Sequence, residues 1–218
     1  MAPSYSPTGL TELMLGDIPA LLKSPETTEI KQFFKGKKFM CLLPGGQLYF
    51  ESKLSLDLDG SPFWKQDRPD SQPQTTVKWE DGVDVDSNVY NYFVLPGKFW
   101  AAHGFRQGDI GVVIYGLRVA FACFADVGPK KSLGEGSIAL HRELGFETVH
   151  NGKVNRKWGI DRGVVTIVFP QSGKRRMFKK KYGEWGYASN NSECYRTGLP
   201  LFERLKTEAT NYTQRIDI

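Results

Sequence analysis

Apolar residues along this chain recur mainly in short runs, rich in β-branched and aromatic side chains and bounded by turn-forming residues. That pattern is typical of β-strands. A Gly-Leu pair at positions 116 and 117 makes a tight connection between two of the runs, so we expect a hairpin over residues 110–125 that delivers Asp126 at its end. The runs predicted as strands are residues 38–43, 48–58, 90–95, 110–115, 118–125 and 164–169.

Helical patterns are fewer and shorter. In residues 11–34 the apolar positions are interrupted by Pro19 and Pro25, which predicts two short helical pieces and no long one. Residues 137–144 have a helical pattern that the following glycine ends, and residues 199–210 have another. The chain is therefore predicted to be mostly β with a few short helices. We expect a small closed β-barrel, specifically of the double-psi type, because closure of the sheet leaves no unpaired strand edge.

The composition is that of a globular protein. With 218 residues, 40% of them apolar, the chain can bury one sizeable core. It has no run of about eighteen apolar residues, so no membrane span is expected. The first residues lack the basic and then apolar pattern of a secretory signal, so either a signal has been removed or the protein is not exported by that route.

The cysteines and histidines predict neither a disulfide scaffold nor a metal site. Three cysteines are an odd number, and their wide spacing contains no CxxC pair. Cys123 stands in an apolar run and is expected to be buried, while a bond between Cys41 and Cys194 stays open. The histidines at positions 103, 141 and 150 share no ligand spacing, and no metal or other cofactor is predicted.

Charge is distributed unevenly along the chain. Residues 51–86 hold nine acidic and four basic residues, whereas residues 150–181 hold ten basic residues against Asp161 alone. A cleft lined by one sign of charge concentrates ligands of the opposite sign, so the acidic block suits a cationic polymer. The basic block must then lie on another side, or the ligand is anionic. It lacks the interleaved aromatic residues and the motifs of nucleic-acid binding, so no nucleic-acid partner is predicted.

Two carboxylates, Asp126 and Glu135, stand on either side of a turn that contains Gly128-Pro129 and Gly134. Nine fully extended residues would separate them by about 30 Å. A pair that hydrolyses a glycosidic bond with inversion stands only ~6.5–9.5 Å apart. Glycine and proline allow the chain to double back, so the pair suits acid/base chemistry. The alternative is an ordinary loop with solvent-exposed acids.

Several motifs occur in one order between residues 45 and 173. They are, in chain order, YFESKLSLDLDG from residue 49, QPQT from 72, YNYFVLP from 90, GDIGVVIYG from 108, VAFACFADVGP from 119, LGEGSIAL from 133 and GVVTIVFPQSG from 163. Together these motifs resemble the fungal chitosanases of glycoside hydrolase family 75. We therefore divide the single domain into an N-terminal extension at 1–44, a catalytic core at 45–173 and a C-terminal extension at 174–218.

The resemblance implies an activity and a catalytic pair. It implies a secreted, endo-acting hydrolase that cleaves β-1,4 bonds in chitosan with inversion. In the family the Asp of the DxGP motif and the Glu of the GExS motif are the proposed catalytic residues, and these are Asp126 and Glu135 here. A monomer is expected.

Physical chemistry suggests a role for each carboxylate. Asp126 follows an apolar strand, where desolvation would keep a proton on it, so it would be the general acid. Glu135 is expected in the first turn of a helix, whose dipole favours an ionised carboxylate, so it would be the general base. The reverse assignment stays open. Ser137 would either orient Glu135 by a hydrogen bond or cap the helix.

Substrate contacts are expected from the acidic block. Asp57 and Asp59 are candidates to line the sugar cleft, and Asp86 is a candidate to bind substrate amines. Trp79, which lies in the acidic block, is the tryptophan predicted to stack against a sugar ring. Two other readings stay open: a hydrolase of the same fold acting on another glycan such as peptidoglycan, and a non-catalytic module that binds an anionic polymer.

Overall fold

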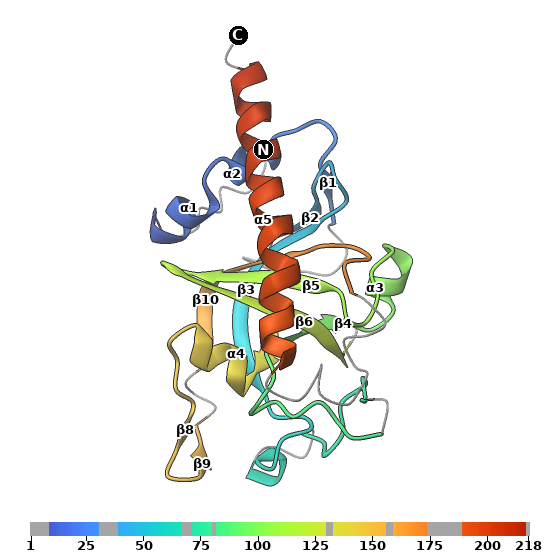
Figure 1. Ribbon diagram of the computed structural model, residues 1–218, viewed down its shortest axis with the longest axis vertical. Coiled ribbons are helices and arrows are strands. Elements are labelled where there is room, and N and C mark those ends of the chain that lie inside the picture. The colour runs from blue at the N-terminus through green and yellow to red at the C-terminus, as the bar shows by residue number, and fades with distance from the viewer. Residues whose placement is uncertain are drawn as a thin grey trace.

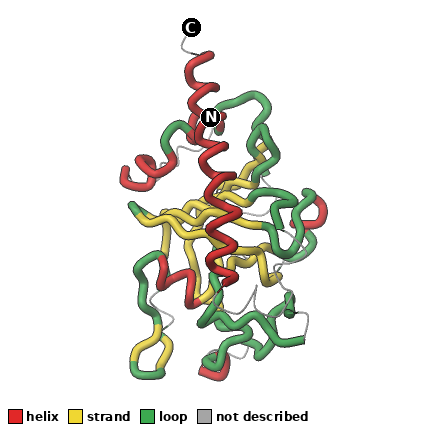
Figure 2. Tube along the Cα trace, viewed as in Figure 1, coloured by secondary structure: helices red, strands yellow, loops and turns green. Residues whose placement is uncertain are grey.

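The computed structural model describes residues 9–30, 39–66, 71–79, 82–129, 133–155, 159–173 and 189–216. A β-barrel forms its centre, with helices on the outside (Figures 1 and 2). The strands are β1 (Thr28–Glu29), β2 (Phe39–Leu42), β3 (Leu48–Asp57), β4 (Tyr92–Pro96), β5 (Ile110–Tyr115), β6 (Arg118–Gly128), β7 (Glu135–Ser137), β8 (Val149–His150), β9 (Lys153–Val154) and β10 (Ile160–Val168). The helices are α1 (Gly9–Leu15), α2 (Ile18–Leu21), the 3₁₀ turn η1 (Trp64–Gln66), α3 (Phe99–Ala102), α4 (Ile138–Glu143) and α5 (Ser189–Ile216).

Six strands close the barrel in the order β3-β10-β5-β6-β4-β7, and β7 pairs back with β3. The pairs β3–β7 and β4–β6 are parallel, and the other pairs around the ring are antiparallel. The predicted closed barrel is thus confirmed, as a mixed one. Outside the ring, β2 pairs with β3 and β1 with β2, while β8 and β9 form a separate two-stranded ribbon.

The predicted hairpin is present, with one difference at its end. β5 and β6 pair antiparallel from Ile110 to the turn at Gly116, whose φ of +57° suits glycine. β6 then continues to Gly128, so Asp126 lies within the strand and not after it. The extra length comes from parallel pairing with β4, in which Asp126 stands opposite Val94 beside a register shift.

The two faces of the barrel strands pack into different parts of the core. Phe50, Phe93 and Phe124 belong to one cluster of buried residues, together with other residues of the same strand face. Val112 and Phe121 belong to a second cluster, in which the opposite strand face meets α1, α2 and α5. Both faces of these strands are buried, which agrees with their continuously apolar runs in the sequence.

The longest helix, α5, corrects the expectation of short helices only. It has 28 residues and runs along the outside of the barrel and beyond it (Figure 1). The predicted segment, 199–210, is its central part. Its first half contains Gly198 and Pro200, both unfavourable inside a helix. Close packing on the barrel accounts for the glycine, because a Cβ on Gly198 would lie 2.3 Å from the ring of Phe121. No described helix is long and apolar enough to cross a membrane.

All three cysteines are buried and free. Burial of Cys123 was predicted and is confirmed. The bond left open between Cys41 and Cys194 is not formed, and Cys194 instead makes a hydrogen bond with Cys123.

Candidate carboxylate site

Asp126 lies near the end of β6, and its side chain is only 6% exposed. Thr76 donates two hydrogen bonds to it, from the backbone N–H at 2.7 Å and from the hydroxyl group at 2.5 Å, both to Oδ1. The segment 71–79 that carries Thr76 also pairs with β6, since the Val77 N–H donates to the carbonyl oxygen of Ala125 at 3.2 Å. The loop thus packs directly over the predicted catalytic aspartate.

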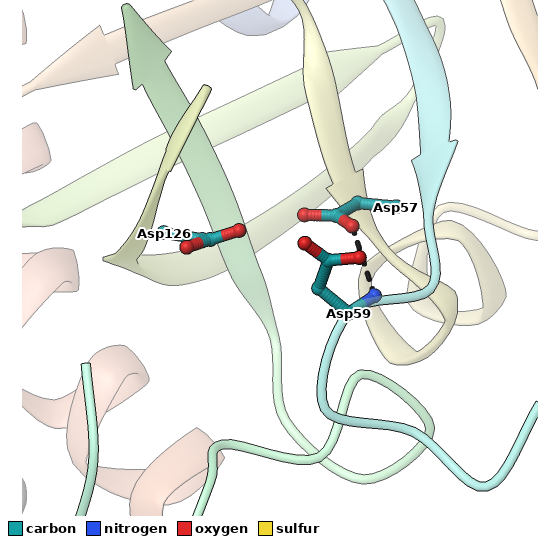
Figure 3. A group of neighbouring side chains, drawn as sticks. All are labelled: Asp57, Asp59 and Asp126. Carbon is teal, nitrogen blue, oxygen red and sulfur yellow. Dashed lines mark hydrogen bonds between the residues drawn. The ribbon is translucent and has the colours of Figure 1, made fainter. Parts of the chain in front are cut away.

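Asp57 and Asp59 approach Asp126 from the end of β3. One carboxylate oxygen of each of the three residues lies within 4.8 Å of the others (Figure 3). The Asp59 N–H donates to Asp57 Oδ1 at 3.0 Å, and the Gln72 N–H donates to Asp59 Oδ1 at 2.8 Å. The Tyr92 hydroxyl group donates to the backbone oxygen of Asp59 at 3.1 Å, so the turn after β3 is fixed from both sides.

Negative charge at this site is concentrated enough to alter protonation. Burial, followed by the charges of Asp59 and Asp126, raises the pKa of Asp57 well above its ordinary value. Glu135 adds to the same effect, which places its charge near the three aspartates. The hydrogen bond from the Asp59 N–H opposes the shift. Asp57 therefore holds a proton more readily than an ordinary aspartate.

Glu135 is the first residue of β7, and the prediction that it begins a helix is wrong. β7 pairs in parallel with β3, with Glu135 opposite Ser55. The preceding Gly134 has φ +81°, and a Cβ there would lie 2.0 Å from the backbone oxygen of Lys53. Because this glycine brings the chain against β3, the segment extends as a strand before α4 begins.

The Glu135 carboxylate reaches towards β6. Its Oε2 lies 3.4 Å from the position that a Cβ on Gly128 would take. Residues two apart on a strand share a face and are about 6.6 Å apart, so Gly128 and Asp126 address the same side of β6. The two carboxyl groups are thus neighbours on one face of the barrel wall.

Ser137 caps α4, which was one of its two predicted roles. Its hydroxyl oxygen accepts hydrogen bonds from the N–H groups of Leu140 and Tyr92, each at 3.1 Å, and it is fully buried. It therefore joins the helix to β4, and its other predicted role, a hydrogen bond that orients Glu135, stays a prediction. The glycine stop at position 145 is also confirmed, with φ +88°.

One predicted substrate contact does not fit its position. Trp79 is only 4% exposed and packs against Tyr90 at 5.0 Å between ring centroids, so neither ring face is open to a sugar. Asp86 is half-buried and accepts a hydrogen bond from the Asn88 N–H at 2.8 Å, and its contact with substrate amines stays a prediction. The neighbouring Ser87 contacts the site, since its hydroxyl group donates to the backbone oxygen of Asp57 at 2.5 Å.

The described residues of the acidic block have different surroundings. Asp57 and Asp59 lie in the site, but Glu51 is buried at 1% exposure. Asp84 pairs with Lys78 at 3.4 Å. Most of the basic block lies outside the described residues, at 156–158 and 174–181.

Two residues of the site were not singled out from the sequence. Thr76 directly follows the QPQT motif, and Tyr92 lies within YNYFVLP. Both motifs pointed to the family without assigning roles to these side chains. In chemical terms, Asp57, Asp59 and Asp126 offer oxygen ligands of the kind that hard divalent cations prefer. The sequence had predicted no metal.

Comparison of the sequence with protein-family models and with curated proteins finds no match. The similarity to family 75 therefore stays a prediction that depends on the motifs.

Proposed function

We propose that this protein is an endo-acting, inverting glycoside hydrolase that cleaves β-1,4 bonds in chitosan or a related amino-sugar polymer. The single observation that carries the proposal is the gathering of Asp126, Glu135, Asp57 and Asp59 at one end of the barrel. One of the first two carboxyl groups donates a proton to the leaving glycosidic oxygen as the C–O bond breaks. The other accepts a proton from the attacking water.

The positions of the pair allow both carboxyl groups to act on one bond. Glu135 Oε2 lies beside Gly128, which shares a face of β6 with Asp126 and is about 6.6 Å from it along the strand. Inversion is what the family resemblance implies, and it requires the two carboxyl groups to stand ~6.5–9.5 Å apart, whereas a retaining pair stands about 5 Å apart.

The charge of the site supports an amino-sugar substrate. Several carboxylates within a few ångströms create a negative potential that attracts glucosamine ammonium groups. We also assign the barrel to the double-psi type, for which the combination of six strands with two parallel pairs is the supporting feature. By the family resemblance, we place the protein outside the cell and expect it to act as a monomer.

A reducing-sugar assay over a panel of glycans tests the proposal. We expect product from chitosan, and a loss of about 10²–10⁴ in turnover for Asp126→Asn and Glu135→Gln. Glu203→Gln is the matched control, because Glu203 is an exposed carboxylate on α5. Circular dichroism and thermal unfolding would establish that each variant folds.

The same panel separates the alternatives. Cleavage of peptidoglycan or of an acidic polysaccharide but not of chitosan would keep the catalytic pair and overturn the substrate. Absence of cleavage on every glycan would overturn the proposal of an enzyme. The remaining hypothesis would be the non-catalytic module that binds an anionic polymer. Full activity in a well-folded Asp126→Asn or Glu135→Gln variant would remove that residue from the mechanism.

A further inference from the structure

The contacts of Asp126 are asymmetric. Among the described residues, both hydrogen bonds that its carboxyl group accepts end on Oδ1, and Thr76 supplies both of them. Rotation of the carboxyl group about its χ2 bond would break both bonds together. Oδ2 is left as the oxygen that is open to another partner.

Thr76 is itself fixed relative to β6. The N–H of Val127, the residue after Asp126, donates to Thr76 Oγ1 at 3.2 Å. Because this oxygen accepts from Val127, its own proton points to Asp126. On the other side, the N–H of Val77 is bonded to the carbonyl oxygen of Ala125. The threonine is therefore anchored to the residues on both sides of the aspartate that it contacts.

Exposure indicates which side of the site Thr76 occupies. Thr76 is exposed, whereas Asp126 is 6% exposed. The threonine thus lies between Asp126 and the solvent and covers Oδ1. Both hydrogen bonds from Thr76 thus lie on the solvent side of the carboxyl group.

We propose that Thr76 is a positioning residue that holds Oδ1 of Asp126 so that proton transfer with the glycan takes place at Oδ2. This inference rests on the proposed glycosidase function. Thr76 does not touch the reacting atoms in this scheme; it acts through Asp126. Misplacement of a catalytic group by about 1 Å costs up to roughly 10²-fold in rate, which sets the size of the expected effect.

Kinetics of two threonine variants test the inference. Thr76→Val keeps the backbone N–H and the side-chain shape but removes the hydroxyl group, and we expect kcat to fall roughly 10- to 100-fold with KM changed by less than about twofold. Thr76→Ser restores the donor and should recover most of the activity. In an Asp126→Asn background, Thr76→Val should cause little further loss, because a residue that acts through Asp126 has nothing left to position. An unchanged kcat in Thr76→Val, or an equal loss in both backgrounds, would overturn the role.

A structural readout keeps this test independent of the proposed activity. Crystal structures of the wild type and of Thr76→Val should differ in the Asp126 carboxyl group, which we expect to rotate or to occupy several orientations in the variant. An unchanged orientation would overturn the inference whether or not a glycan is cleaved. If the wild type cleaves no glycan but the carboxyl group rotates in the variant, the proposed function fails and the positioning of Asp126 by Thr76 stands.

Discussion

Asp126 and Glu135 lie on the two strands that flank β4. Asp126 stands opposite Val94 on one side, and Gly136, next to Glu135, stands opposite Phe93 on the other. Adjacent strands are about 4.8 Å apart, so the backbones that carry the two carboxylates are about 10 Å apart across the sheet. Their side chains can converge from that distance without touching, which leaves space for a water molecule.

The inverting mechanism implied by the family resemblance predicts the stereochemistry of the product. Proton NMR during the first turnovers should detect the α-anomer released from the β-linked polymer, because water attacks directly from the face opposite the leaving group. Release of the β-anomer would indicate a covalent intermediate. Asp126 and Glu135 would then still be the catalytic residues, but the mechanism would be one of retention.

A second prediction concerns the two aspartates at the end of β3. Burial and the charges of Asp59 and Asp126 raise the pKa of Asp57 well above its ordinary value, so Asp57 holds a proton more readily than an ordinary aspartate. Asp59→Asn should weaken binding of a glucosamine oligomer at pH 5.5 by roughly 5- to 10-fold at low ionic strength, and Asp57→Asn should weaken it much less.

Calorimetric titration of an Asp126→Asn background, with and without added salt, measures both effects. Glu203→Gln should leave the affinity unchanged. Equal losses in the Asp57 and Asp59 variants would contradict the protonation state assigned to Asp57. Stronger binding in both would indicate an anionic ligand.

A third prediction concerns a carboxyl group away from the site. Glu51 is buried, accepts a hydrogen bond from the Tyr49 hydroxyl group at 2.8 Å, and has no partner for Oε2 among the described residues. Burial raises its pKa from 4.5 to about 7; the Tyr49 bond opposes the shift and the charge of Glu12 adds to it. Because the folded state binds this proton more tightly than the unfolded state, the associated stability is present below pH 4.5 and is lost as the pH rises through 7.

Glu51→Gln should therefore change how stability depends on pH. At pH 8 the variant should be more stable than the wild type by up to about 3 kcal/mol, and at pH 4 the difference should nearly vanish. Urea unfolding at the two pH values measures it. Glu26→Gln, at an exposed position, is the control and should show no such dependence. A Glu51→Gln variant that is destabilised equally at both pH values would show that the carboxyl group makes a favourable contact instead.

A fourth prediction concerns the cysteines. All three are buried and free, and burial raises the pKa of Cys41 to about 12, so little reactive thiolate is available. An aromatic disulfide reagent should label none of them in the native protein and all three in denaturant. Fewer than three reactive thiols in unreduced, denatured protein would mean that a disulfide forms.

Local sequence signals were sufficient for the elements that depend on neighbouring residues. The β5–β6 hairpin follows from Gly116 and from the apolar runs on both sides of it. The end of α4 follows from Gly145, whose positive φ is a common helix stop. The closed barrel followed from the number of strands and their edges, without any knowledge of which strands pair.

Errors occurred where a distant segment decides the local structure. Glu135 has a helical pattern after it, but pairing with β3, some eighty residues earlier, makes it part of a strand. Trp79 stands in a polar stretch, yet its ring packs on Tyr90. Thr76 carries no distinctive signal, because its importance arises only when residues 71–79 pack over β6. These contacts join residues that are far apart in the sequence and close together in space. No local sequence pattern reveals such contacts.

The barrel is completed by only three residues, Glu135 to Ser137, and the first of them carries the proposed catalytic carboxylate. The middle one, Gly136, is tightly enclosed, since a Cβ there would lie 2.9 Å from Leu140 and 3.0 Å from Leu54. Closure of the fold and presentation of the carboxylate therefore depend on the same few hydrogen bonds. Partial detachment of β7 would remove the proposed activity while most of the hydrophobic core remained intact, so loss of that activity on heating should precede the loss of secondary structure.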